Sequence, residues 1–132
     1  MKYLLDTDIC IYLINKKHQN LAQRIVEVPS GDICVSSITQ AELEYGVSKS
    51  RDKVKNSQAL SKFLAVISVE SFDSLAAVSY GQIRADLESR GETIGGMDLL
   101  IAGHAKSRGY TVVTNNVREY SRIEGLSVEN WV

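Results

Sequence analysis

Short apolar runs rich in β-branched residues recur along the chain, and stretches with helical periodicity separate them. Strands that alternate with helices in this way usually form a parallel sheet with helices packed on both faces. The alternation therefore predicts an α/β fold of three layers, α/β/α, with a mostly parallel central sheet. The strands are expected at residues 2–5, 33–35, 66–69, 111–113 and 127–128.

Several helix ends can be recognised from residue types. Ser37 followed by Gln40 fits a capping box, and Asp73 is a favoured N-cap. Gly109 is a common residue at a helix C-terminus. We expect helices over residues 37–48, 53–64, from 73 to at least 88, and 98–109, the third with an apolar stripe of Ala76, Tyr80, Ile83 and Leu87.

One hydrophobic core is enough for the whole chain. The 132 residues are 44% hydrophobic, Pro29 is the single proline, and no linker, repeat or low-complexity tract divides the sequence. We therefore expect one domain spanning residues 1–132. The net charge of −1 gives no overall basic field, so a nucleic-acid partner would have to be held by a local patch or by metal ions.

Cys10 and Cys34 lie in apolar runs and not at metal-ligand spacing, which favours small buried hydrophobic residues in a reducing compartment. The apolar N-terminal stretch ends at Asp6, so no signal peptide is expected. No run approaches the roughly 18 apolar residues of a membrane span. These features together indicate a cytoplasmic protein with no membrane contact.

Asp6 and Asp8 interrupt the first apolar run, YLLDTD, at the point where the first strand should end. An unpaired carboxylate in an apolar setting is costly, so something must compensate these charges. Ligands of parallel α/β sheets gather outside the carboxyl ends of the strands. The two aspartates are therefore expected at the edge of the sheet where chemistry is usually placed.

Glu42 and Asp98 are two further acids that fall on the apolar stripes of predicted helices. Side chains three and four residues apart share a helix face, so both acids are expected to point inward. Glu42 shares its stripe with Ile38, Ala41 and Tyr45, and Asp98 shares its stripe with Ile101, Ala102 and Ala105.

Each of these acids also has a structural explanation. Asp8 is suited to cap the helix after the first strand, and Asp98 to stabilise the first turn of its helix through the helix dipole. Glu42 could form a buried ion pair with a lysine or arginine. Asp6 could accept hydrogen bonds from neighbouring backbone amides. Three inward acids together are better explained by a shared site than by three separate roles.

Converging acids without matching bases repel one another and raise at least one pKa unless cations are bound. Carboxylate oxygens suit Mg²⁺ or Mn²⁺, and such ions assist in-line displacement at phosphorus. The chemistry expected is metal-dependent phosphodiester hydrolysis. A metal-free ribonuclease would need paired histidines, but His18 is expected on the polar surface and His104 inside an apolar helix as a structural residue.

The segments LLDTDICIYLI, SSITQAELEYG, GGMDLLIAGHAKSRGYTVVTNNVREYSRI and LSVENWV resemble the PIN-domain ribonucleases, specifically the VapC-type toxins of bacterial toxin–antitoxin pairs. The resemblance covers nearly the whole chain and keeps the order and spacing of the motifs. It implies a compact α/β/α PIN-like domain, a Mg²⁺ or Mn²⁺ site, and RNA hydrolysis that leaves a 5′-phosphate and a 3′-hydroxyl.

The resemblance also assigns residues. By motif, the family's first three acids fall on Asp6, Glu42 and Asp98. The fourth family acid, often an aspartate after a threonine, falls on the segment Thr114–Asn115–Asn116. Asn116 is neutral there and could still bind a metal-bound water, whereas Glu119 just beyond it is the acid expected to substitute. VapC-type proteins commonly carry asparagine where this chain has Asp8, and the added charge could tighten metal binding or only cap a helix.

Partners follow from the same resemblance. It implies an RNA substrate, most specifically initiator tRNA cut in the anticodon region, and a homodimer. It also implies a VapB-type antitoxin that blocks the acidic site and represses its own operon in complex with the toxin, so that operator DNA is contacted only through that complex. The basic residues expected near RNA are Lys49, Arg51, Lys53, Lys55, Arg118 and Arg122, although such runs are commonly solvated surface.

Two other families share parts of the pattern. DTD after an apolar strand fits a haloacid-dehalogenase-type phosphatase, but TNN lies 16 residues from the C-terminus, which leaves no room for the later motifs of that family. A non-catalytic receiver-like Mg²⁺-binding domain would need an aspartate at the end of its third strand and a later lysine. Here the first acid at that place is Glu70, and no lysine follows TVVT.

Overall fold

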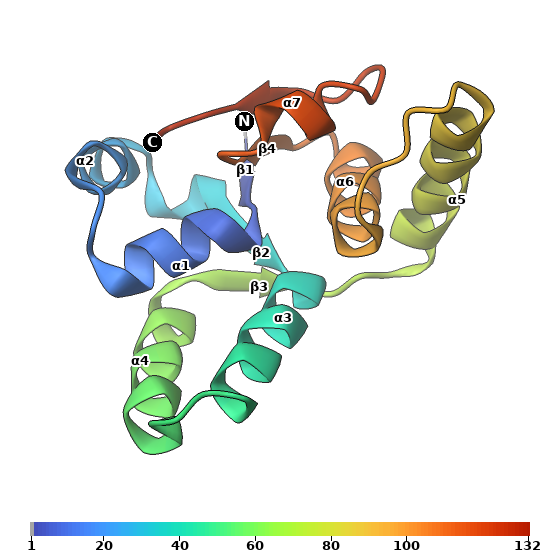
Figure 1. The fold of residues 1–132 in the computed structure, drawn as a ribbon. Helices are drawn as coiled ribbons and strands as arrows, with labels where there is room; N and C mark the ends of the chain where they lie inside the picture. The colour runs from blue at the N-terminus through green and yellow to red at the C-terminus, as the bar shows by residue number, and fades with distance from the viewer. Residues whose placement is uncertain (1) are drawn as a thin grey trace.

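The computed structural model describes residues 2–132, which form a five-stranded sheet with helices on both faces (Figure 1). The strand order is β3-β2-β1-β4-β5, and all four neighbouring pairs are parallel. The order reverses between β1 and β4, and ligands usually bind at such a switch point. The strands are β1 (Tyr3–Leu5), β2 (Ile33–Ser36), β3 (Ser68–Glu70), β4 (Thr111–Val113) and β5 (Val128–Glu129).

The predicted parallel sheet is confirmed, but only β4 keeps both predicted ends. β1 begins one residue later than predicted, at Tyr3, and β2 ends one residue later, at Ser36. β3 begins at Ser68 and not at residue 66, because helix α4 continues through Val66. β5 covers Val128–Glu129, one residue later than predicted. The apolar residues at the end of α4 therefore made the third strand look longer in the sequence than it is in the structure.

The helices lie in two layers, one on each face of the sheet (Figure 1). Helices α5 and α6 pack together on one face, whereas α1, α2 and α4 cover the other, and α3 contacts both layers. Sequence patterns did not predict α2 or α7. The helices are α1 (Thr7–Asn15), α2 (Gln19–Glu27), α3 (Ser37–Ser48), α4 (Lys53–Val66), α5 (Ser74–Ser89), α6 (Gly96–Arg108) and α7 (Val117–Tyr120), with a 3₁₀ turn at Ser30–Asp32.

Two helices are capped by residues other than those predicted. Ser36, not Ser37, is the N-cap of α3, and its hydroxyl accepts a backbone N–H of the first turn at 3.0 Å. Asp6 takes the N-cap position of α1, so the expectation that Asp8 caps this helix was wrong. Asp73 caps α5 as predicted. Ser36 is the last residue of β2, and Asp6 comes directly after β1. In both cases the cap lies at the end of a strand because the strand joins the next helix without a loop.

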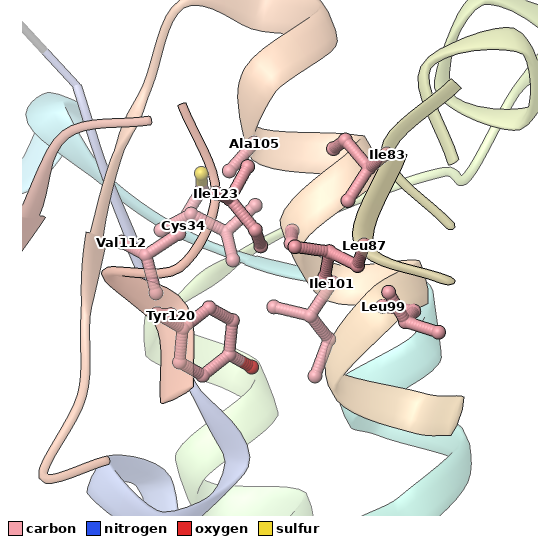
Figure 2. Packing of buried hydrophobic residues seen from close by; sticks show 11 residues of the cluster. Cys34, Ile83, Leu87, Leu99, Ile101, Ala105, Val112, Tyr120 and Ile123 are labelled. Carbon is pink, nitrogen blue, oxygen red and sulfur yellow. The ribbon is translucent and has the colours of Figure 1, made fainter. Parts of the chain in front are cut away.

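Successive side chains of each strand point to opposite faces of the sheet and pack into two hydrophobic clusters. Leu4 and Cys34 face the cluster under α5 and α6, and Leu5 and Val35 face the cluster on the opposite side. Figure 2 shows the first cluster, where side chains from the sheet meet those of both helices. Cys34 and Cys10 are buried and form no disulfide, as predicted.

Helices α5 and α6 are in close backbone contact at Gly103. A Cβ atom at this position would lie 2.8 Å from the backbone Cα and N of Tyr80. α6 ends at Arg108 and is followed by the C-cap Gly109, which has the left-handed φ of 70° expected of a C-terminal glycine. Across residues 2–132, every helix is too short or too polar to cross a membrane.

Candidate active site

Asp6 lies at the switch point of the sheet, directly after β1. Its backbone N–H bonds to the Val113 carbonyl of β4 at 2.9 Å, which fixes it between the two central strands. The side chain is only 4% exposed, and its oxygens accept hydrogen bonds from the Thr7 backbone N–H at 2.8 Å and from the Thr114 hydroxyl at 2.7 Å. Burial raises the pKa of Asp6, and these hydrogen bonds oppose the rise.

Thr114 connects Asp6 to the segment after β4. Its hydroxyl is buried, donates to Asp6 and accepts the backbone N–H of Asn116 at 2.8 Å. The side chain of Asn116 makes no capping hydrogen bond to α7. Thr114 therefore holds the Asp6 carboxylate, whereas Asn116 contributes through its backbone.

Asp8 lies two residues after Asp6, in the first turn of α1, and its carboxyl is close to that of Asp6. It accepts hydrogen bonds from the backbone N–H groups of Ile9 at 2.7 Å and Asn115 at 3.1 Å. Burial, and next the charge of Asp6, raise the pKa of Asp8 to about 6. Asp8 is thus part of the same acidic group and also ties α1 to the segment after β4.

Glu42 projects from α3 at the edge of the buried surface. Its Oε1 accepts a hydrogen bond of 2.6 Å from the Thr7 hydroxyl of α1, and Thr7 also lies 3.1 Å from the hydroxyl of Thr39. The predicted stripe through Ala41 and Tyr45 was wrong, because both are exposed. Thr39 and Leu43 face the core instead, which leaves Glu42 half-buried.

Asp98 lies in the first turn of α6, on the predicted apolar stripe. Its Oδ1 accepts a hydrogen bond of 3.3 Å from the hydroxyl of Tyr120, which is fully buried. Burial raises the pKa of Asp98 to about 6, and the charges of Asp6, Glu119 and Glu42 act in the same direction. These charges act on Asp98 because the four acids gather at one place.

Five acids therefore form what we term the acid cluster: Asp6, Asp8, Glu42, Asp98 and Glu119. None of the ion pairs within residues 2–132 includes any of these five acids, so none of the five has a lysine or arginine partner there. The alternative that Glu42 forms a buried ion pair is thus wrong. Converging acids without cations repel one another, which is the arrangement expected of a cation-binding site.

The donor set of the acid cluster fits a hard divalent cation. Carboxylate oxygens are the preferred ligands of Mg²⁺ and Mn²⁺. Over the described part of the chain, no three acidic, histidine or cysteine side chains converge closely enough to hold one ion by themselves. Mg²⁺ suits such an open set, because it usually keeps several waters and takes only one or two carboxylates directly.

The basic residues lie outside the acid cluster. Lys49 is exposed near the end of α3, with its ammonium 5.0 Å from the ring of the exposed Tyr45, and Arg51 follows it. Arg118 is exposed on α7 beside Glu119. The guanidinium of Arg122 instead donates to a backbone carbonyl of the loop before α6, so this residue has a structural contact. Lys53 and Lys55 are exposed at the start of α4.

The two histidines lie apart from the acid cluster. His104 is buried, with Nδ1 2.7 Å from the Ser36 hydroxyl, and its ring meets Phe72 edge-on. Burial lowers the pKa of His104, which keeps the ring neutral. His18 is half-buried and packs on the ring of Tyr12, so it is less solvated than predicted. No histidine pair is available for metal-free acid–base catalysis among the described residues.

Sequence reasoning did not single out Thr7 and Tyr120. Each is a polar side chain that hydrogen-bonds an acid of the cluster from a distant part of the chain. Their partners are far away in sequence, so helical periodicity gives no signal for them. The only available signal was proximity: Thr7 lies between Asp6 and Asp8, and Tyr120 follows Glu119.

The raised pKa values of Asp8 and Asp98 predict that the stability these two groups contribute to the metal-free protein is lost as pH rises. The folded state binds the Asp8 and Asp98 protons more tightly than the unfolded chain does, so this stabilisation is full below about pH 4 and is lost as pH passes about 6. Asp98→Asn removes one of these charges. We expect the metal-free variant to be more stable than the parent protein at pH 7.5, by about 1 kcal/mol after allowance for partial exposure.

The check is chemical denaturation of both proteins in chelator at pH 5 and pH 7.5. The difference in free energy of unfolding between Asp98→Asn and the parent protein should be smaller at pH 5. The neutral His104 contributes equally to both proteins, so it does not affect this difference. An equal difference at the two pH values would contradict an elevated pKa for Asp98.

Comparison with known proteins places these features in a family. A sequence profile of the PIN domain matches residues 3–126. The tRNA(fMet)-specific endonuclease VapC of Shigella flexneri is 43% identical over 131 residues, which cover 99% of this chain and 98% of that protein.

Solved structures agree with the sequence comparison. A VapBC2 complex from Rickettsia felis, bound to a DNA fragment from its promoter, contains a chain with a TM-score of 0.93 and 42% identity, covering 100% of both chains. A DNA-bound VapBC complex from Salmonella typhimurium gives a TM-score of 0.94 at 42% identity, covering 100% of this chain and 99% of that one.

Proposed function

Because the chain belongs to the PIN-domain family and to its VapC ribonucleases, we propose that it is the Mg²⁺- or Mn²⁺-dependent endoribonuclease toxin of a toxin–antitoxin pair. The observation that carries the metal dependence is the acid cluster, which gathers five acids at the β1–β4 switch point with no cationic partner in residues 2–132. We also propose that residues 1–132 act as one nuclease domain. The phosphatase and receiver alternatives are not supported by this family membership.

We assign the residues of the acid cluster as follows. Asp6, Glu42 and Asp98 would hold the cation, directly or through water, and Glu119 would take the fourth acidic position in place of Asn116. A bound divalent cation supplies positive charge that stabilises charge developing at phosphorus. Thr114 and Thr7 orient the carboxylates of Asp6 and Glu42 by hydrogen bonds. Asp8 adds a charge beside Asp6.

The proposed substrate is tRNA, most specifically initiator tRNA, cut in the anticodon region. The name of the Shigella flexneri relative supports initiator tRNA, and recognition of single-stranded loops is the usual route to RNA specificity. Lys49, Arg51 and Arg118 are exposed and free of ion pairs to acids in residues 2–132, so they can approach RNA phosphates. Cleavage of tRNA would place the action of the toxin in the cytoplasm.

The proposed partners are a VapB-type antitoxin and, through that complex, operator DNA. The similar Rickettsia felis and Salmonella typhimurium structures are VapBC complexes bound to DNA, which supports this assembly. A homodimer is proposed from family membership. An apolar groove between α1, α3 and α4 has Glu42 at its edge, so a protein segment that fills it would reach the acid cluster.

The test is incubation of the antitoxin-free protein with purified initiator tRNA and, separately, with an elongator methionine tRNA. We expect one discrete cut in the anticodon loop of the initiator tRNA and much slower cleavage of the elongator tRNA. Addition of the purified cognate antitoxin should stop the reaction. Equal cleavage of both tRNAs would remove initiator specificity, and cleavage of neither would remove tRNA as the substrate.

A further inference from the structure

The hydroxyl of Tyr120 lies between two acids that come from different parts of the fold. It is 3.3 Å from Oδ1 of Asp98 on α6, and it also lies close to the carboxylate of Asp6 at the end of β1. Burial and then the charges of Asp6 and Asp98 raise the pKa of Tyr120. The distance to Asp98 is longer than usual for an O–H···O bond. Tyr120 thus donates to Asp98 and has its hydroxyl near Asp6, the other acid at this place.

The ring of Tyr120 is held rigidly. It is fully buried in the cluster under α6, and Figure 2 shows it among apolar side chains, with the hydroxyl oxygen directed away from Val112. A phenylalanine would fill the same space, so packing alone does not require the hydroxyl. The hydroxyl is therefore the part of this side chain that remains to be explained.

The two carboxylates depend on Tyr120 to different degrees. Asp6 is held by two donors of its own, the Thr7 backbone N–H and the Thr114 hydroxyl. For Asp98, Tyr120 is the sole hydrogen-bond donor found among residues 2–132. Without the phenol, Asp98 would have no group to set its distance from Asp6.

We propose that Tyr120 is a positioning residue that holds the Asp6 and Asp98 carboxylates at the separation needed to bind one divalent cation. This inference rests on the proposed function, because it assumes that these two acids hold the cation. Groups that orient metal ligands typically change metal affinity by 10- to 100-fold when removed. The effect should appear in metal affinity, not in the chemistry of the loaded protein.

The test variant is Tyr120→Phe, with Tyr110→Phe as the matched control. The control removes a half-buried hydroxyl that donates to Glu70 at 3.1 Å, outside the acid cluster. Binding of Mn²⁺ is measured by electron paramagnetic resonance for the parent protein and both variants, beside thermal unfolding. The Mn²⁺ concentration for half-maximal tRNA cleavage is measured in parallel.

We expect Tyr120→Phe to weaken Mn²⁺ binding at least about tenfold and to raise the half-maximal Mn²⁺ concentration by the same factor, with a near-normal rate at saturating metal. Tyr110→Phe should bind Mn²⁺ like the parent protein. Unchanged Mn²⁺ affinity in Tyr120→Phe would overturn the positioning role alone. Absence of Mn²⁺ binding by the parent protein would overturn the proposed metal-dependent function as well.

Discussion

Replacement Asp6→Asn is expected to lower RNA cleavage by at least about 10²–10³-fold, because stabilisation by a bound cation is worth several kcal/mol and each 1.36 kcal/mol is a factor of ten. Asp6 is the most buried member of the acid cluster and lies between the two central strands. An amide keeps the shape and can still accept the Thr7 backbone N–H, but it removes the charge that attracts the cation.

The same variant should fold at least as well as the parent protein in the absence of metal. Burial raises the pKa of Asp6, so the folded state disfavours the charge that Asp6→Asn removes. The matched control is Asp86→Asn on α5, which removes an exposed carboxylate that pairs with Arg90 away from the acid cluster. Cleavage is measured with both variants at saturating Mn²⁺. A rate for Asp6→Asn equal to that of the control would remove Asp6 from the mechanism.

Gly103→Ala is expected to destabilise the fold by about 2 kcal/mol, the usual scale for overpacking a rigid core contact. The added Cβ would lie 2.8 Å from the backbone Cα and N of Tyr80, and a helix backbone cannot rotate away as a flexible side chain can. Helices α5 and α6 must then separate, which loosens the cluster that contains Ile83 and Leu99. The gain in helix propensity from glycine to alanine, about 1 kcal/mol, offsets only part of this cost.

Gly81→Ala is the control for helix propensity alone. Gly81 lies on the exposed side of α5, and a Cβ there would meet nothing within 4 Å. We expect Gly81→Ala to raise stability slightly while Gly103→Ala lowers it, both measured by urea denaturation. Equal stabilities of the two variants would show that α5 and α6 can separate without cost.

The sequence predicted the sheet and the apolar stripes of α5 and α6, because these depend on regular periodicity. The stripe of α6 through Ile101 and Ala105 is buried as expected, and it directs Asp98 to the acid cluster. The order of apolar runs was enough to place Asp6 at the carboxyl end of the first strand, and the structure places that strand at the centre of the sheet. These features follow from local patterns that the fold preserves.

Other features depended on contacts that local patterns do not contain. The stripe of α3 was misplaced because Thr39 counts as polar in sequence, yet it is buried beside the hydroxyl of Thr7. Helix α2 has no side-chain cap at His18, and α7 has only four residues, so neither has a clear helical signature. The connection from Tyr120 to Asp98 spans 22 residues and exists only after the chain has folded.

The most direct test of the central account is tRNA cleavage by the purified, antitoxin-free protein across a titration of Mg²⁺ and of Mn²⁺, with a chelator control and sequencing of the fragment ends. The account predicts discrete cuts that require metal, disappear in chelator and leave a 5′-phosphate and a 3′-hydroxyl. Cleavage that persists in chelator, or that leaves a 2′,3′-cyclic phosphate, would contradict the assignment of the acid cluster as the centre of a metal-dependent nuclease.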